Sequence, residues 1–121
     1  MSIEVNITAD DHWIAGEDKS FRFFCVDSAG AAQDMTGWAL EWVVRRSANS
    51  PTATFTKTTG ATTIAISNGI GTSDLATVTV TDDDTVSLVT GQYVHALRRT
   101  DAGSEVVLAF GTAELLKAAT R

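Results

Sequence analysis

The sequence predicts an all-β protein, a single antiparallel β-sandwich of seven to nine short strands over residues 1–121. Apolar and polar residues alternate with a period of two along most of the chain, as in half-buried strands. Turn-forming residues interrupt this alternation roughly every 8–12 residues, a spacing typical of sandwich strands. The hydrophobic content of 44% and the charged content of 20% fit one ordinary folded domain.

The first half of the chain predicts four strands. Residues 3–7 alternate strictly, and residues 21–26 become apolar on both faces near their end. An Asp-Ser-Ala-Gly turn leads towards residues 38–44, the most strongly patterned segment. After a loop with the only proline, the Thr-rich residues 54–58 predict an edge strand with Lys57 exposed. We expect this strand and the first one to be open edges, able to pair with another chain.

The second half predicts the remaining strands. Residues 62–66 and 76–80 are separated by a Ser-Asn-Gly-Ile-Gly turn. Residues 92–99 carry Tyr, His and Leu on one face, and a turn with Asp and Gly connects them to residues 105–116. Within this last strand we expect a bulge or kink at Gly111, because a glycine inside a strand often marks one.

Residues 81–91 predict one short helical turn near 82–89. Thr81 can cap this turn, the aspartates at 82–84 suit the positive end of the helix dipole, and Gly91 ends it. Three adjacent carboxylates could also bind Ca²⁺, but the D-x-D-x-D-G spacing of a calcium loop is missing. We therefore interpret the three aspartates as part of a helix cap.

The balance of charge argues against several classes of partner. The chain has 9 Lys and Arg against 15 Asp and Glu, a net charge of −6, whereas nucleic acid and anionic membranes attract clustered Lys and Arg. The single cysteine, Cys25, permits no intrachain disulfide. The N-terminal residues lack the basic and apolar regions of a signal peptide. We expect synthesis in the cytoplasm, and no nucleic-acid or membrane partner.

No group of residues predicts catalysis. Asp10, Asp11 and His12 are consecutive and converge poorly on one metal ion. His95 has no nucleophile or acid that the sequence places near it, and Cys25 lacks a catalytic context. We expect no enzyme activity, no cofactor and no metal. His95 is then a hydrogen-bonded structural residue, and Cys25 a small buried hydrophobe.

The three tryptophans divide between core and surface. Trp38 and Trp42 share one face of their strand with apolar neighbours, which predicts a place in the core. Trp13 follows the polar run Asp-Asp-His, so we expect it to reach a partner. An exposed pair of Trp13 and Tyr93 would suit stacking on a sugar.

Two pairs of arginines end two of the predicted strands. Arg45 and Arg46 follow one strand, and Arg98 and Arg99 end another. If these strands are neighbours, the four side chains form a basic patch on an acidic protein, suited to an acidic face of a partner subunit. The alternative is that they are solvated strand ends.

Residues 14–117 combine turn and strand motifs in a specific order. The motifs are DKSFRFF at 18–24, VDSAG at 26–30, DMTGW at 34–38, GQY at 91–93, RTDAG at 99–103, VVLAFG at 106–111 and TAELL at 112–116. This pattern resembles the immunoglobulin-like N-terminal domain of siphophage upper baseplate proteins, and small phage and prophage virion proteins of similar build. The resemblance carries over no catalytic residue.

The resemblance implies an immunoglobulin-like sandwich that serves as a virion building block. Such a protein is made in the host cytoplasm, binds other virion structural proteins and can form homo-oligomers. The baseplate proteins continue into a trimerising region, whereas this chain ends shortly after its last predicted strand. We therefore expect an adaptor of the tail, baseplate or neck. The alternatives are a capsid decoration protein and a carbohydrate- or receptor-binding module, and exposure of the tryptophans separates the sugar-binding alternative from the others.

Overall fold

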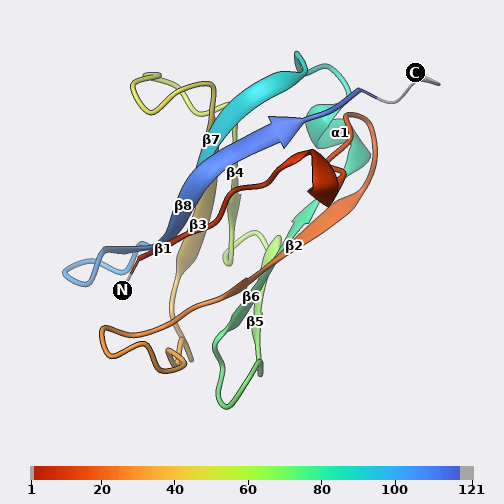
Figure 1. The fold of residues 1–121 in the computed structure, drawn as a ribbon. Helices are drawn as coiled ribbons and strands as arrows, with labels where there is room; N and C mark the ends of the chain where they lie inside the picture. The colour runs from red at the N-terminus through yellow and green to blue at the C-terminus, as the bar shows by residue number, and fades with distance from the viewer. Residues whose placement is uncertain (1, 118–121) are drawn as a thin grey trace.

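Residues 2–117 are described by the computed structural model, and they form two β-sheets packed around one core (Figure 1). One sheet has the strand order β1-β8-β7-β3-β4, and the other has the order β2-β6-β5. The strands are β1 (Ile3–Glu4), β2 (Lys19–Phe24), β3 (Leu40–Arg45), β4 (Phe55–Thr58), β5 (Ile64–Ser67), β6 (Leu75–Val80), β7 (Gly91–Arg99) and β8 (Val106–Leu115). The predicted all-β sandwich is confirmed. No helix within residues 2–117 is long and apolar enough to span a membrane.

The first strand departs from the predicted antiparallel pairing. In immunoglobulin sandwiches of the constant type, the first strand lies in the same sheet as the second and beside it. Here β1 instead runs parallel to the last strand, with Ile3 opposite Ala109. The other pairings between named strands are antiparallel. As a result, the outer edge of β2 has no neighbouring strand within residues 2–117.

The segments predicted as edges do lie at edges, since β1 and β4 flank the five-stranded sheet. The expected exposure of Lys57 on β4 is wrong. Lys57 is opposite Trp42 in the ladder, so its aliphatic part lies over the core side of the sheet. Its Nζ atom is 2.6 Å from Oδ2 of Asp84, and only 11% of the side chain is exposed.

The core lies between the two sheets, because the period-two alternation directs every second side chain inward. Trp42 on β3 is completely buried, and its ring contacts those of Phe21 and Phe23 on β2. Trp38 precedes β3 and is only half-buried, so the core prediction holds fully for Trp42 alone. Burying one large apolar side chain contributes about 2–3 kcal/mol, and Trp42 joins the two sheets in this way.

The predicted helical turn is α1 (Asp82–Thr85). It ends at Thr85, earlier than residue 89, and Leu88 beyond it is partly buried and packs against the core. A second turn, the 3-10 helix η1 (Ala9–Asp11), was not predicted. The carboxylate of Asp11 accepts the N–H of Thr8 at 2.7 Å and so closes this turn.

The bulge expected at Gly111 lies elsewhere. Leu97 is opposite Ala109 while Arg98 is opposite Val107, so Leu108 is the extra residue of β8. Gly111 remains in regular register. A Cβ atom at this position would collide with the carbonyl oxygen of Val5. Glycine is needed here because the N-terminal segment approaches β8 so closely.

Candidate protein-binding surface

The four arginines do not form the expected basic patch. Strands β3 and β7 are neighbours, but they are antiparallel. Arg45 is opposite Val94, whereas Arg99 is opposite Leu40. Val94 and Arg99 are five positions apart on β7, so Arg45 and Arg99 lie about 17 Å apart along the sheet at the usual rise of a strand. Arg45 and Arg46 lie at one end of the sheet, and Arg98 and Arg99 lie at the other.

The arginines at the first end have local partners. Arg45 donates through Nη1 to the carbonyl oxygen of Ser50 at 3.1 Å. The guanidinium of Arg46 lies over the ring of Tyr93, 4.5 Å from its centroid. These contacts hold the loop after β3 and cover one face of the tyrosine ring.

The arginines at the second end form ion pairs. The Nε atom of Arg98 is 3.0 Å from a carboxylate oxygen of Glu41, and that of Arg99 is 2.8 Å from one of Asp101. Arg99 also covers the ring of Trp38, 4.0 Å from its centroid. The alternative, that the arginines are solvated strand ends, fits Arg46 and Arg98, which are exposed, but not fully Arg45 and Arg99, which are partly buried.

Trp13 does not face a partner, and that expectation is wrong. Its side chain is 0% exposed, because η1 reverses the chain and the next residues pair with the C-terminal strand. The N–H of Leu116 donates to the carbonyl of Trp13 at 2.8 Å, which directs the indole between the sheets. The ring makes edge contacts with Phe21 and Tyr93. Tyr93 is also buried, so these two aromatic side chains form no sugar-stacking surface.

His95 is a hydrogen-bonded core residue, as predicted, and its neighbours fix its tautomer. The indole Nε1–H of Trp42 donates to Nδ1 of His95 at 3.1 Å. The carbonyl of Val5 can only accept, so Nε2 of His95 carries the proton in their 2.6 Å bond. Both ring nitrogens are thus engaged, and the histidine links the core to the N-terminal strand.

We expect the protein to lose stability as the pH falls below 6.5. Burial lowers the pKa of His95 below its usual 6.5, and the bond to Val5 offsets only part of this effect. The unfolded chain then binds a proton that the folded chain does not, so the free energy of unfolding falls by up to about 1.4 kcal/mol per pH unit. This loss begins near pH 6.5 and stops below the folded pKa. Urea denaturation between pH 7.5 and about 4.5 measures it.

The exposed His12 provides the control for this pH dependence. Its backbone is left-handed, a conformation that asparagine tolerates. The free energy of unfolding of His12→Asn should therefore change with pH as it does in the parent chain. The assignment to His95 would be contradicted if the free energy of unfolding of the parent chain did not change with pH. It would also be contradicted if His95→Gln showed the same change with pH as the parent chain.

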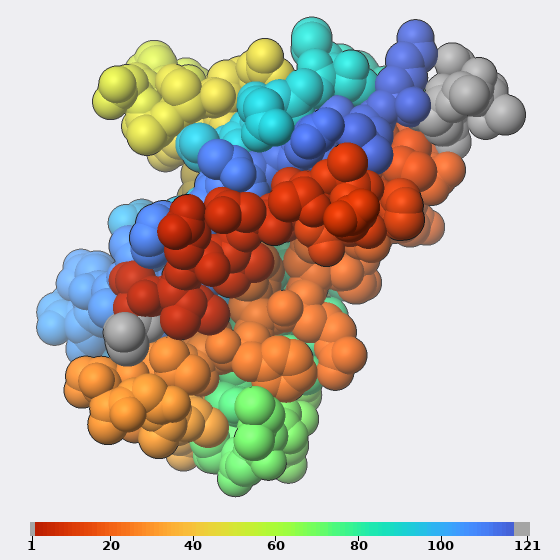
Figure 2. Space-filling model, in the orientation of Figure 1, coloured from red at the N-terminus to blue at the C-terminus, as the bar shows by residue number. Residues whose placement is uncertain are grey.

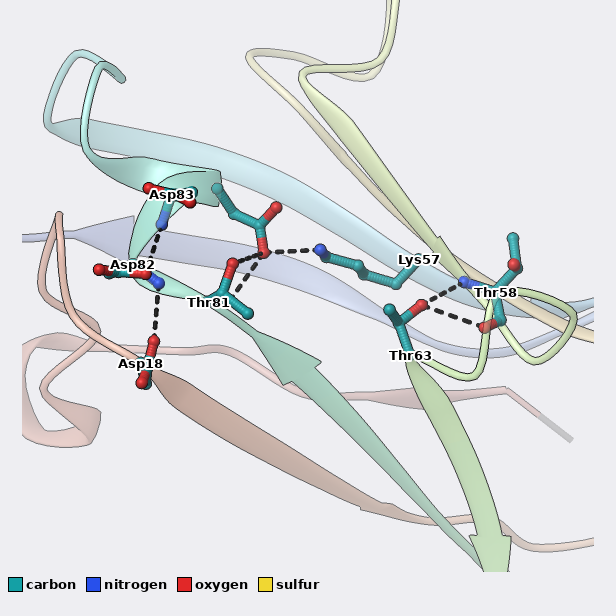
Figure 3. A network of polar contacts seen from close by, with 8 residues as sticks. Asp18, Lys57, Thr58, Thr63, Thr81, Asp82 and Asp83 are labelled. Atoms are coloured by element: carbon teal, nitrogen blue, oxygen red, sulfur yellow. Dashed lines mark hydrogen bonds and ion pairs between the residues drawn. The ribbon is translucent and has the colours of Figure 1, made fainter.

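Cys25 and Asp84 have structural roles as well. Burial raises the pKa of the Cys25 thiol to about 11, and the charge of Asp74 adds to the shift, so the thiol stays protonated. Figure 3 shows the polar contacts around α1. Burial alone would raise the pKa of Asp84, but hydrogen bonds from Lys57 and Thr81 outweigh it and hold the pKa below 3.8. The predicted capping role is confirmed for Asp84.

The outer face of the five-stranded sheet carries an apolar groove. Val43, Val94 and Ala96 lie there on the two central strands, and Phe110 of β8 is 43% exposed beside them. With Ala48 of the β3–β4 loop, these residues line a groove of about 340 Å³. Figure 2 shows this loop (yellow) projecting beside β7 and β8 (cyan and blue). Arg45 supplies a positive charge at the margin.

This groove was not predicted from the sequence, although a signal was present. Val43 and Val94 occupy the alternate phase of their strands, where a polar residue is usual. The apolar side chains become contiguous only through the register, which places Val43 opposite Ala96 and Ala96 opposite Phe110. The chain has no match among protein-family models or curated proteins. No group of three metal-ligating side chains is found within residues 2–117.

Proposed function

We propose that this chain is a structural, protein-binding module of a phage or prophage particle, and that it joins other virion proteins through the groove on its five-stranded sheet. One observation carries the proposal. The outer face of an antiparallel sandwich is normally solvated and polar, whereas here Val43, Val94, Ala96 and Phe110 are contiguous and apolar. Such patches are typical of sites where proteins associate.

Two further observations favour a binding module over the other classes. His95 and Cys25, the side chains best suited to chemistry, are buried and serve the core. Trp13 and Tyr93 are buried too, which removes the aromatic pair on which sugar binding depended. The particle context rests on the resemblance of residues 14–117 to baseplate domains. The proposed location is the tail, baseplate or neck, and the alternative is the surface of the capsid.

Phe110→Glu is expected to weaken association by about tenfold or more, because a charge in the centre of an apolar interface costs at least the energy of a hot-spot contact. Light scattering should be measured on the purified chain alone and on its mixture with dissociated particle proteins. Ile70→Glu is the matched control, since Ile70 is 81% exposed and lies outside the groove. A monomer that ignores every particle protein, or equal effects of the two substitutions, would overturn the proposal.

A further inference from the structure

The free edge of β2 is the longest unpaired strand edge within residues 2–117. Strands β1, β2, β4 and β5 end the two sheets, with 2, 6, 4 and 4 residues respectively. The edge of β4 is partly closed, because the backbone N–H of Thr58 donates to Oγ1 of Thr63 and its carbonyl accepts the hydroxyl of Thr63 (Figure 3). No such bridge closes the middle of β2 among the hydrogen bonds of residues 2–117.

The hydrogen-bonding groups on the β2 edge follow from its ladder with β6. The N–H of Cys25 donates to the carbonyl of Asp74 at 2.9 Å, so residues in phase with Cys25 face β6. The alternate residues Ser20, Arg22 and Phe24 therefore direct their N–H and C=O groups away from β6. These are the groups that an added strand would pair with.

A groove runs along the same edge. It has a volume of about 230 Å³ and is lined by residues 5–7 and Asp11 on one side and by residues 19–23 on the other. The N-terminal segment cannot itself move over to pair with β2 while it is held on β8. The N–H groups of Val5 and Ile7 donate to carbonyls of β8 at 2.8 Å, and His95 holds the carbonyl of Val5. The position next to the second strand is thus left open.

The charge of this edge differs from that of the whole protein. Lys19 and Arg22 lie on β2 in a chain of net charge −6. The ion pairs within residues 2–117 involve Lys57, Arg98 and Arg99, so neither β2 cation has a carboxylate partner there. Lys19 donates to the carbonyl of Asp11, and Arg22 lies over the ring of Phe24.

We infer that the β2 edge binds an extended segment of another protein, which adds a fourth strand to the three-stranded sheet. Its residues alternate between apolar side chains that face the groove and acidic side chains opposite Arg22. A second copy of this chain is disfavoured in the symmetric register centred on Arg22, because that register brings Arg22 against Arg22. The inference rests on the proposed role as a protein-binding module and assigns it a second surface and a class of partner.

The probe is an acetylated and amidated peptide, Thr-Val-Glu-Val-Glu-Val-Thr, titrated into the ¹⁵N-labelled chain. We expect the largest amide shifts at Ser20, Arg22 and Phe24, together with slower hydrogen exchange of their N–H groups. The peptide with Lys in place of both Glu residues should bind about tenfold more weakly or worse. The inference would be overturned if the largest amide shifts occurred away from β2. It would also be overturned if the Lys peptide bound as tightly as the Glu peptide, or if the Glu peptide did not bind.

Two substitutions at Arg22 separate backbone pairing from charge. Arg22→Pro removes an N–H that points away from β6, so it blocks the added strand without removing a bond of the native ladder. Arg22→Glu keeps the backbone and reverses the charge. Both should weaken binding of the Glu peptide about tenfold or more. Thr56→Pro, an exposed position on the β4 edge, is the matched control and should bind normally.

The proposed groove on the five-stranded sheet and the proposed β2 site can be tested independently of each other. Phe110→Glu alters the groove on the other sheet and should leave peptide binding unchanged. If the peptide does not bind while Phe110→Glu still weakens association with particle proteins, the β2 site is wrong and the proposed function stands. Peptide binding that survives both Arg22 substitutions also overturns the β2 site.

Discussion

Replacing Trp13 with alanine is expected to lower the free energy of unfolding by about 4 kcal/mol. The side chain is completely buried between the two sheets and makes edge contacts with the rings of Phe21, Phe55 and Tyr93. Truncating a buried tryptophan removes this apolar area and leaves a cavity that the surrounding residues fill only in part. Urea denaturation at pH 7.5 measures this change. The urea concentration at the midpoint of unfolding should fall, while the dependence of the unfolding free energy on urea concentration stays the same.

Trp13→Phe is the informative companion to this variant. The indole Nε1–H is a buried donor without a hydrogen-bond partner within residues 2–117. Phenylalanine removes this unpaired group while keeping most of the ring, so we expect a loss of about 1 kcal/mol or less. A loss below about 1 kcal/mol for the alanine variant would instead indicate an exposed indole, as the sequence suggested.

Gly111→Ala is expected to cost about 3 kcal/mol and to release the N-terminal strand. A Cβ atom would collide with the carbonyl of Val5 and lie 2.7 Å from Oδ1 of Asn6. The methyl group therefore separates β8 from residues 5–7, and the bond from His95 to the Val5 carbonyl is lost. Overpacking at a rigid backbone contact and a buried donor left unpaired account for a cost of this size.

Hydrogen exchange locates the effect of this substitution. The N–H groups of Val5 and Ile7, which donate to β8, should exchange faster in Gly111→Ala, while those of β6 keep their protection. Gly71→Ala is the control, because a Cβ atom there meets nothing within 4 Å. Unchanged exchange at Val5 and Ile7 would show that the N-terminal strand does not depend on Gly111.

The strands were predictable because their signal is local. A sheet with one buried face requires alternation, and this pattern locates each of the eight strands within a few residues. Edge positions followed from composition, as in the Thr-rich segment that became β4. The parallel placement of β1 was not predictable, since an alternating strand carries no information about which neighbour it joins.

The exposure and the grouping of the candidate binding residues depend on tertiary structure, and the predictions made for them from the sequence were wrong. Trp13 follows exposed polar residues, yet the unpredicted turn η1 reverses the chain and buries it. The arginine patch failed because antiparallel pairing separates Arg45 from Arg99, although both end their strands. The groove around Phe110 arises from cross-strand register, which periodicity within single strands does not specify.

The parallel pairing of β1 with β8 also determines how the protein responds to a pulling force. Because the two strands run in the same direction, their outer ends, near Ile3 and Leu115, point towards opposite ends of the sandwich (Figure 1). Tension applied at these ends slides one strand along the other and loads the hydrogen bonds and the His95 link together. An antiparallel pair pulled from one end would open bond by bond. We therefore expect the contacts that place the N-terminal strand to resist tension applied at these two points.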